Sequence, residues 1–135
     1  MAVKVFTLEE ANRLLPQIER GVRFLSEAAQ NVHKLQDQVS VLSLLGSEKS
    51  ESPEHREFKE KKKRFEELVV LYNRKLEELQ RLGCIMKDLR TGLVDFYGST
   101  EGRLIFFCWK LGEKEIAFWH ELDGGFRGRR PVSEL

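Results

Sequence analysis

The hydrophobic pattern of the chain changes at Gly83, and this change constrains the fold more than any other feature of the sequence. Before Gly83, apolar residues recur at the heptad spacing of an amphipathic helix. After it the period becomes two, and aromatic and β-branched residues take over, as they do in strands. The sequence therefore predicts an α+β fold. A long antiparallel α-helical hairpin is followed by a small antiparallel β-meander and an Arg/Gly-rich C-terminal tail.

The first part of the chain is expected to form two helices, over residues 7–45 and 54–82. Thr7 and Glu10 make a capping box, in which each side chain satisfies an unpaired amide at the helix start. The segment Gly46 to Pro53 carries no apolar side chain and suits the connection between antiparallel helices. Both apolar stripes are longer than the rest of the chain can cover. Part of the apolar seam is therefore expected to pack against a second copy, which would make a homodimer through the hairpin.

The second part is expected to form a β-meander over residues 84–121 and a tail over residues 122–135. Gly-containing turns separate four strand-like apolar stretches, and one of them, Leu104 to Trp109, is apolar on both faces and is expected to be covered on both sides. We expect strands near Ile85–Lys87, Leu93–Phe96, Arg103–Trp109 and Glu115–Glu121. All of this fits a single domain over residues 1–135.

Charge and cysteine content exclude several classes of function. The formal net charge is +1, so no global field attracts nucleic acid or an anionic membrane. The basic run Lys61 to Arg64 is flanked by glutamates and is better interpreted as a solvated helix face than as a nucleic-acid contact. We expect no secretory segment, and no apolar run of the sequence reaches the ~20 residues that span a bilayer. Two distant cysteines do not form a disulfide framework, and we expect a cytoplasmic protein of bacterial type without membrane contact.

The residues that could carry chemistry lie in the second part of the chain. Thiolate, imidazole and carboxylate groups are the usual ligands of zinc or iron, although no tight spacing signature such as C-x-x-C is present. We predict a polar pocket on the meander whose ligand is a metal ion or a small anion. The predicted ligand-binding residues are Asp95, Glu113, His120, Glu121, Arg127 and Arg129. A divalent metal would be held by His120, Asp95 and Glu121, with Cys108 and Asp88 as further candidates by residue type.

Whether Cys108 joins His120 depends on the register of the last hairpin. A two- or four-residue loop points Cys108 away from the face that carries His120. A three- or five-residue loop changes the parity and places Cys108 on the same face as Phe118 and His120. The first register gathers more apolar residues on one face, so we favour Cys108 and His120 on opposite faces.

Each candidate also has a purely structural interpretation. His120 could bond a backbone carbonyl or a carboxylate such as Asp95. Asp95 interrupts a hydrophobic run and must find a partner or become protonated. In the tail, arginines and glycines could cradle an anion. Alternatively, Phe126 covers the sheet and the arginines pair with Asp88, Asp95 or Glu121.

Short motifs spread over nearly the whole chain carry a family resemblance. They are Phe6-Thr7 with Glu10-Ala11-Asn12, Leu14-Leu15-Pro16, Gly83 with Lys87-Asp88, Gly92-Leu93-Val94-Asp95-Phe96, Cys108-Trp109 with Gly112-Glu113, Trp119-His120-Glu121, and Gly125-Phe126 with Gly128-Arg129. With these motifs the chain resembles a bacterial family known as domain of unknown function 2203. It departs from the family pattern at Tyr97, where proline is usual, and at Phe107, where leucine is usual. The resemblance implies a compact bacterial cytoplasmic protein and no particular activity, cofactor or substrate.

Three classes of function follow from these observations. The leading hypothesis is a small binding protein with the pocket described above. The second is a structural or adaptor protein that acts through its helical hairpin. The third is a hydrolase or lyase with Asp95 or Glu121 as base and His120 as acid. An enzyme needs His120 and a carboxylate in an open cleft, whereas an adaptor would leave them buried or paired.

Overall fold

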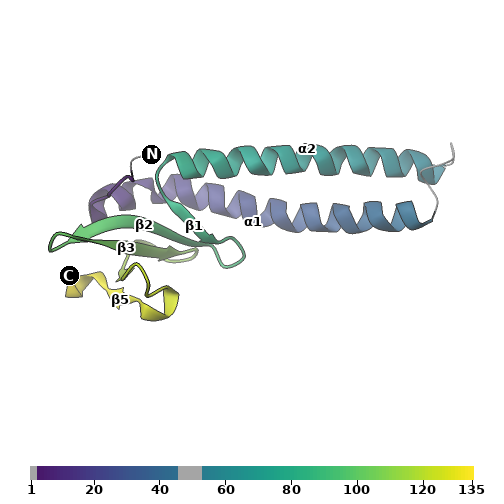
Figure 1. The fold of residues 1–135 in the computed structure, drawn as a ribbon. Helices are drawn as coiled ribbons and strands as arrows, with labels where there is room; N and C mark the ends of the chain where they lie inside the picture. Colours follow the sequence, from purple (N-terminus) through teal and green to yellow (C-terminus); the bar gives the residue numbers. More distant parts are fainter. Residues whose placement is uncertain (1–2, 46–52) are drawn as a thin grey trace. The chain divides into compact units, whose positions relative to one another are not determined.

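The computed structural model describes residues 3–45 and 53–135. Two long helices, α1 (Leu8–Leu44) and α2 (Pro53–Arg81), precede an antiparallel five-stranded sheet (Figure 1). The expected α+β fold with a helical hairpin and a β-meander is thereby confirmed. Except for Pro53, the expected linker lies outside the described residues.

The start of α1 forms as its local sequence predicts. The Glu10 N–H donates to Thr7 Oγ1 at 3.1 Å, and the Thr7 N–H donates to Glu10 Oε1 at 2.9 Å. The bond from the Thr7 backbone N–H is the main cause of the lowered pKa of the Glu10 carboxyl, and the Thr7 side chain lowers it further. Just before the helix, the Phe6 N–H donates to the Tyr97 carbonyl at 2.7 Å, which holds the N-terminal segment against the sheet.

The chain divides into two compact units, which are described separately. The sheet unit comprises Met1–Arg23 and Glu77–Leu135, and the hairpin unit comprises Phe24–Leu76. In the described part of both units, α1 and α2 are too polar along their length to cross a membrane.

The sheet has the strand order β1-β2-β3-β4-β5, so every strand pairs with its neighbours in sequence. Its strands are β1 (Ile85–Asp88), β2 (Leu93–Thr100), β3 (Arg103–Lys110), β4 (Phe118–His120) and β5 (Arg130–Pro131). The tail was expected to lie beyond the meander, yet it supplies β5, where Arg130 pairs with Trp119 of β4. The tail therefore completes the sheet edge next to His120.

β4 is shorter than the strand expected over Glu115–Glu121, because the chain before it is held by other contacts. The Ile116 N–H donates to Asn12 Oδ1 of α1 at 2.8 Å, so it does not enter the sheet. The Trp109 indole N–H donates to the Glu113 carbonyl at 2.9 Å, and the Lys110 N–H donates to Glu113 Oε1 at 2.7 Å. A broad loop thus replaces the tight hairpin turn.

The sheet unit contains a core that covers both faces of β3. Ile105 to Trp109 are all buried, as the doubly apolar sequence of this strand predicts. On one face Phe96 packs edge-to-face on Phe6, with ring centroids 5.3 Å apart. At Gly21 of α1, a Cβ atom would lie 2.6 Å from Leu79 of α2, so the absent side chain lets these two residues approach.

Candidate metal centre

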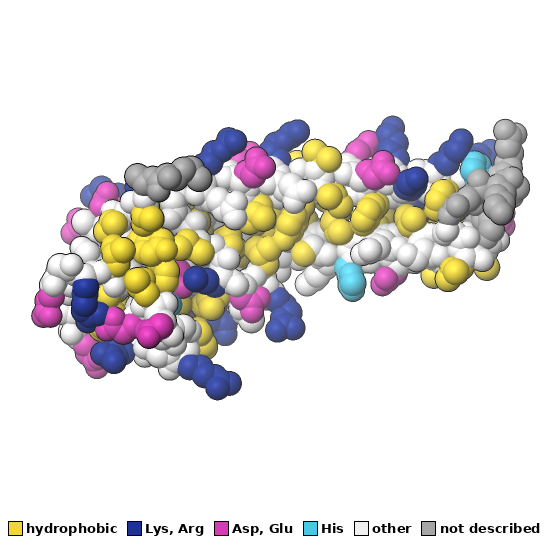
Figure 2. Space-filling view, viewed as in Figure 1, with side chains coloured by type: hydrophobic (Ala, Val, Ile, Leu, Met, Phe, Trp, Pro, Cys, Tyr) yellow, Lys and Arg dark blue, Asp and Glu magenta, His cyan; other side chains and the backbone are white. Residues whose placement is uncertain are grey.

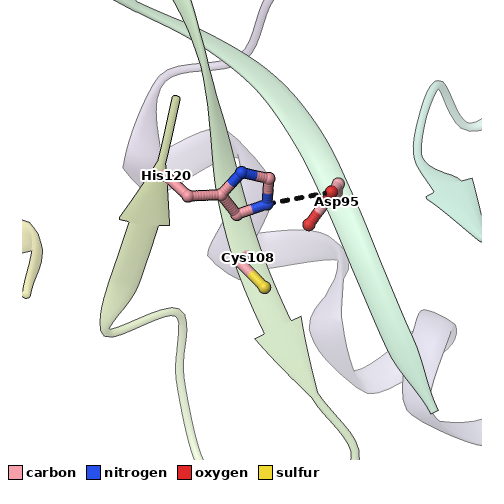
Figure 3. Close-up of side chains that lie close together, drawn as sticks. All are labelled: Asp95, Cys108 and His120. Atoms are coloured by element: carbon pink, nitrogen blue, oxygen red, sulfur yellow. Dashed lines mark hydrogen bonds and ion pairs between the residues drawn. The ribbon is translucent and has the colours of Figure 1, made fainter. Parts of the chain in front are cut away.

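Three neighbouring strands bring Asp95, Cys108 and His120 together (Figure 3). Asp95 on β2 pairs directly with Cys108 on β3, which in turn pairs with Phe118 on β4. His120 lies two residues beyond Phe118. Since side chains alternate with period two, all three point to the same face of the sheet.

The register favoured from sequence, with Cys108 and His120 on opposite faces, is wrong. The pairs Cys108 with Phe118 and Phe106 with His120 give the odd parity that places both residues on one face. The parity is odd because the connection is the broad loop anchored by Asn12 and Glu113, not a short turn. Cys108 was a candidate by residue type, and only the register argument had separated it from His120.

The three side chains form a compact, buried cluster. Their potential ligand atoms lie within 4.8 Å of one another. Asp95 is 1% exposed, Cys108 0% and His120 2%. These are the ionisable groups that water reaches least in the sheet, so each of them needs a partner within the protein.

The hydrogen bonds of His120 define the tautomer of its ring. Nδ1 lies 2.6 Å from the Glu121 carbonyl oxygen, which can only accept, so Nδ1 carries a proton. Nε2 lies 3.1 Å from Asp95 Oδ2. A neutral His120 would therefore turn the Nε2 lone pair toward a carboxylate oxygen, an arrangement that requires a proton or a cation between the two atoms.

Asp95 has one oxygen without a partner. Oδ2 faces His120, whereas Oδ1 is buried and accepts no hydrogen bond. Unsatisfied buried polar atoms are uncommon in folded proteins, and a missing ion is one recognised cause. The carboxylate therefore has a second oxygen that could accept a cation.

The two cysteines differ in their surroundings. Burial, reinforced by the Asp95 carboxylate, raises the pKa of Cys108 to about 12. Without a cation Cys108 is thus a neutral thiol at neutral pH, and a metal ion would take the place of its proton. Burial also raises the pKa of Cys84, to about 11, but its thiol donates to the Leu79 carbonyl at 3.2 Å and takes no part in the cluster.

Two further predicted residues, Glu113 and Arg129, form a clasp beside the cluster. Arg129 Nη2 donates to Glu113 Oε1 at 2.6 Å and to the Cys108 carbonyl at 3.3 Å. The guanidinium stacks 4.1 Å from the Phe118 ring centroid and 4.8 Å from that of Phe126. The tail is therefore fastened over the face of the sheet that carries Cys108.

The remaining predicted residues lie outside the cluster. The Glu121 side chain pairs with Arg103, so only its backbone carbonyl contacts His120. Arg127 is exposed in a short 3-10 helix, Phe126–Gly128. Asp88 accepts the Arg90 N–H at 2.9 Å and closes its own turn. Of the three residues predicted to hold a metal, the structure brings Asp95 and His120 together and directs the Glu121 carboxylate elsewhere.

Comparison with known proteins gives one match. No curated protein and no solved structure shows significant similarity to the chain. A family profile matches residues 4–132, which include all three residues of the cluster and the clasp beside it. The chain thus belongs to the family described as "Uncharacterized conserved protein (DUF2203)".

Proposed function

We propose that this protein binds a divalent transition-metal ion through Asp95, Cys108 and His120. The observation that carries the proposal is the convergence of a thiol, an imidazole and a carboxylate, with all ligand atoms within 4.8 Å of one another. This set of sulfur, nitrogen and oxygen donors matches zinc best, because zinc accepts all three and prefers few ligands at short range.

The surroundings of the cluster support this assignment. A histidine that ligates a metal usually donates its other ring N–H to a carbonyl or carboxylate, as Nδ1 of His120 does to Glu121. A cation would also satisfy the orphan oxygen of Asp95. A tetrahedral ion would keep one position beyond the three protein ligands.

We assign the ion a structural role. Each ligand comes from a different strand, so one ion would join β2, β3 and β4. Three protein ligands leave one tetrahedral position, as in catalytic sites. The three residues are at most 2% exposed, however, so burial keeps substrate from that position and favours a structural role. Such an ion would stabilise the native sheet, since the site does not exist in the unfolded chain.

Metal analysis of the purified protein tests the proposal. We expect about one equivalent of zinc per chain after exchange into metal-free buffer, as for other tightly bound structural ions. Replacement with Co²⁺ should give a thiolate-to-cobalt charge-transfer band that disappears in Cys108→Ser. A wild-type protein that holds only trace metal, and gives no such band with added Co²⁺, would contradict the proposal.

Matched variants distinguish the metal ligands from residues that do not bind the metal. Asp95→Asn, Cys108→Ser and His120→Ala should each lose the metal. His33→Ala should retain it, because His33 is an exposed histidine of the hairpin unit. Glu121→Gln should also retain it, since that carboxylate pairs with Arg103. Circular dichroism of each variant separates metal loss from unfolding.

Two other functions considered for this region have less support. A small anion at the cluster would need free cations beside it, yet Arg129 is paired with Glu113, and Arg127 is exposed whereas the cluster is buried. A hydrolase or lyase would need Asp95 and His120 in an open cleft, whereas both are buried. The buried pair fits a metal-binding or structural role better.

The reducing environment of the cytoplasm suits the proposed ligand set. Cys84 and Cys108 are both free thiols. A thiolate ligand keeps its metal most readily where disulfides do not form. We therefore retain the cytoplasm as the proposed location.

A second candidate function is a scaffold or adaptor that acts through the helical hairpin, as a homodimer. The observation that favours it is the lack of any buried side chain in α2 between Pro53 and Leu76, all of which are described. Half-buried apolar residues there leave surface for a partner. Light scattering tests the homodimer, and a monomer with no captured partner would count against it.

A further inference from the structure

One stretch of α2 in the hairpin unit exposes large apolar side chains to solvent. Val70 is 57% exposed and Leu71 is 43% exposed. Together with Glu66, Glu67 and Arg74 they line one shallow hollow on the helix, here named the Val70 face. Figure 2 shows hydrophobic side chains that reach the surface along the hairpin. Exposed apolar surface rimmed by charge is typical of an interaction site.

The charges of the Val70 face have opposite signs at its two ends. Glu66 and Glu67 precede the apolar pair, and Arg74 follows it. A face of this kind is complementary to itself when it is turned end for end, which is the condition for a two-fold interface. We propose that the Val70 face binds the same face of a second copy of this chain, with the two α2 helices antiparallel.

Helix geometry defines the pairing. The two-fold axis would pass at the level between Val70 and Leu71. Glu67 and Arg74 each lie 3.5 residues from that level, about 5 Å along a helix that rises ~1.5 Å per residue. Each Arg74 therefore lies opposite Glu67 of the second copy. The apolar side chains of both copies fill the centre, as in an antiparallel coiled coil.

The charge order also excludes the parallel arrangement. In parallel helices Glu67 would face Glu67 and Arg74 would face Arg74, and both contacts are repulsive. Glu67 is available for pairing because its side chain is 65% exposed, although Lys63 lies 4.0 Å away on the same helix. Charge thus selects the antiparallel dimer.

The size of the face predicts a weak association. A stable interface usually involves about 20–30 residues on each side, and the Val70 face has far fewer. The dimer should therefore form at high protein concentration and dissociate on dilution. This inference rests on the hairpin as an association surface, the second candidate above, and is independent of metal binding.

A single engineered cysteine tests the pairing directly. Val70 lies next to the proposed axis, so in Val70→Cys the two thiols of a dimer would meet. Native Cys84 and Cys108 are buried and should not interfere. With diamide as oxidant, we expect Val70→Cys to give a covalent dimer on a non-reducing gel that is lost when reductant is added.

The matched control is Glu60→Cys, at an exposed position on the same helix. It lies 10.5 residues from the axis, so the two thiols would be about 30 Å apart and should not cross-link. Equal cross-linking of both variants would mean random collision and would overturn the proposal. The absence of cross-linking in Val70→Cys at high concentration would overturn it as well.

Charge reversal tests the assignment of Glu67 and Arg74. Arg74→Glu or Glu67→Arg alone places like charges opposite each other, so each should weaken the dimer roughly tenfold in sedimentation analysis. The double variant Glu67→Arg with Arg74→Glu should restore the affinity to within a few-fold of wild type. A double variant no better than the singles, or a wild type that is monomeric at every concentration, would overturn the proposal. Metal content measured on the same samples keeps this outcome separate from that of the metal centre.

Discussion

The sheet unit buries two polar side chains, whereas no described polar residue of the hairpin unit is buried. In the sheet unit Asp95 and His120 are buried and paired with each other. In the hairpin unit, charged pairs such as Glu57 with Lys61 lie one turn apart on the helix, with Glu57 54% exposed. Exposed pairs of this kind contribute little to stability, whereas a buried pair must be satisfied. Specific chemistry is therefore expected in the sheet unit and surface association in the hairpin unit.

The largest expected effect comes from breaking the buried pair. Asp95→Ala would remove both the partner of His120 Nε2 and one proposed metal ligand, so it should lower the free energy of unfolding by about 3 kcal/mol. Glu57→Ala removes a half-exposed pair of the hairpin unit and leaves Lys61 its bond to Gln38 at 3.1 Å, so it should cost less than about 0.5 kcal/mol. Urea denaturation measures both. Similar costs for the two variants would remove the distinction between the units.

The core of the sheet unit is closely packed around Gly98, and this packing can be tested by mutation. A Cβ atom on Gly98 would lie 2.4 Å from the Phe107 ring, so Gly98→Ala should cost about 2 kcal/mol through overpacking. Phe107→Leu in the same chain should recover part of this loss, because it removes the ring that clashes. A double-mutant cycle measures the coupling, and strictly additive costs would argue against the clash.

Local sequence predicts the helices and the order of the strands, because those features depend on nearby residues. Thr7 and Glu10 are three residues apart, and the capping box forms as expected. The partnership of Cys108 with His120 depends instead on contacts between distant parts of the chain. Asn12 binds the Ile116 amide across 104 residues, and Arg129 reaches Glu113 across 16. Such contacts set the loop that defines the register, and periodicity alone does not encode them.

The partners of Glu121 and of the tail arginines also could not be predicted from the sequence alone. Residue type made Glu121 a reasonable metal ligand, but its carboxylate is taken by Arg103 of β3. The tail arginines were expected to pair with Asp88, Asp95 or Glu121 if they were structural. Arg129 instead finds Glu113, which the broad loop positions beside Cys108. Choosing among several possible partners requires the three-dimensional arrangement.

Cys84 should make the sheet unit sensitive to alkaline pH. Its folded pKa of about 11 lies above the usual value of 9.0. Below pH 9 the thiol is neutral in the folded and in the unfolded protein, so it does not change the free energy of unfolding. As pH rises from 9 to 11 the unfolded thiol ionises first, so the protein should lose on the order of 2 kcal/mol. Between pH 8 and 11, the free energy of unfolding should fall less steeply for Cys84→Ala than for wild type. Equal falls would show that Cys84 is not the cause of the alkaline loss.

The smallest expected effect within the sheet unit is at the capping box of α1. Thr7→Ala removes the acceptor of the Glu10 N–H and should cost about 1 kcal/mol at neutral pH. The pKa of Glu10 is lowered in the folded state, so the contribution of its carboxylate is present above pH 4.5 and is lost as pH falls through the folded pKa. Thr7→Ala keeps the backbone N–H that donates to this carboxylate, so most of its cost should remain in acid, whereas Glu10→Gln and wild type should converge in stability there. Because this cap is exposed yet belongs to the sheet unit, a cost as large as that of Asp95→Ala would mean that burial does not determine which polar contacts matter.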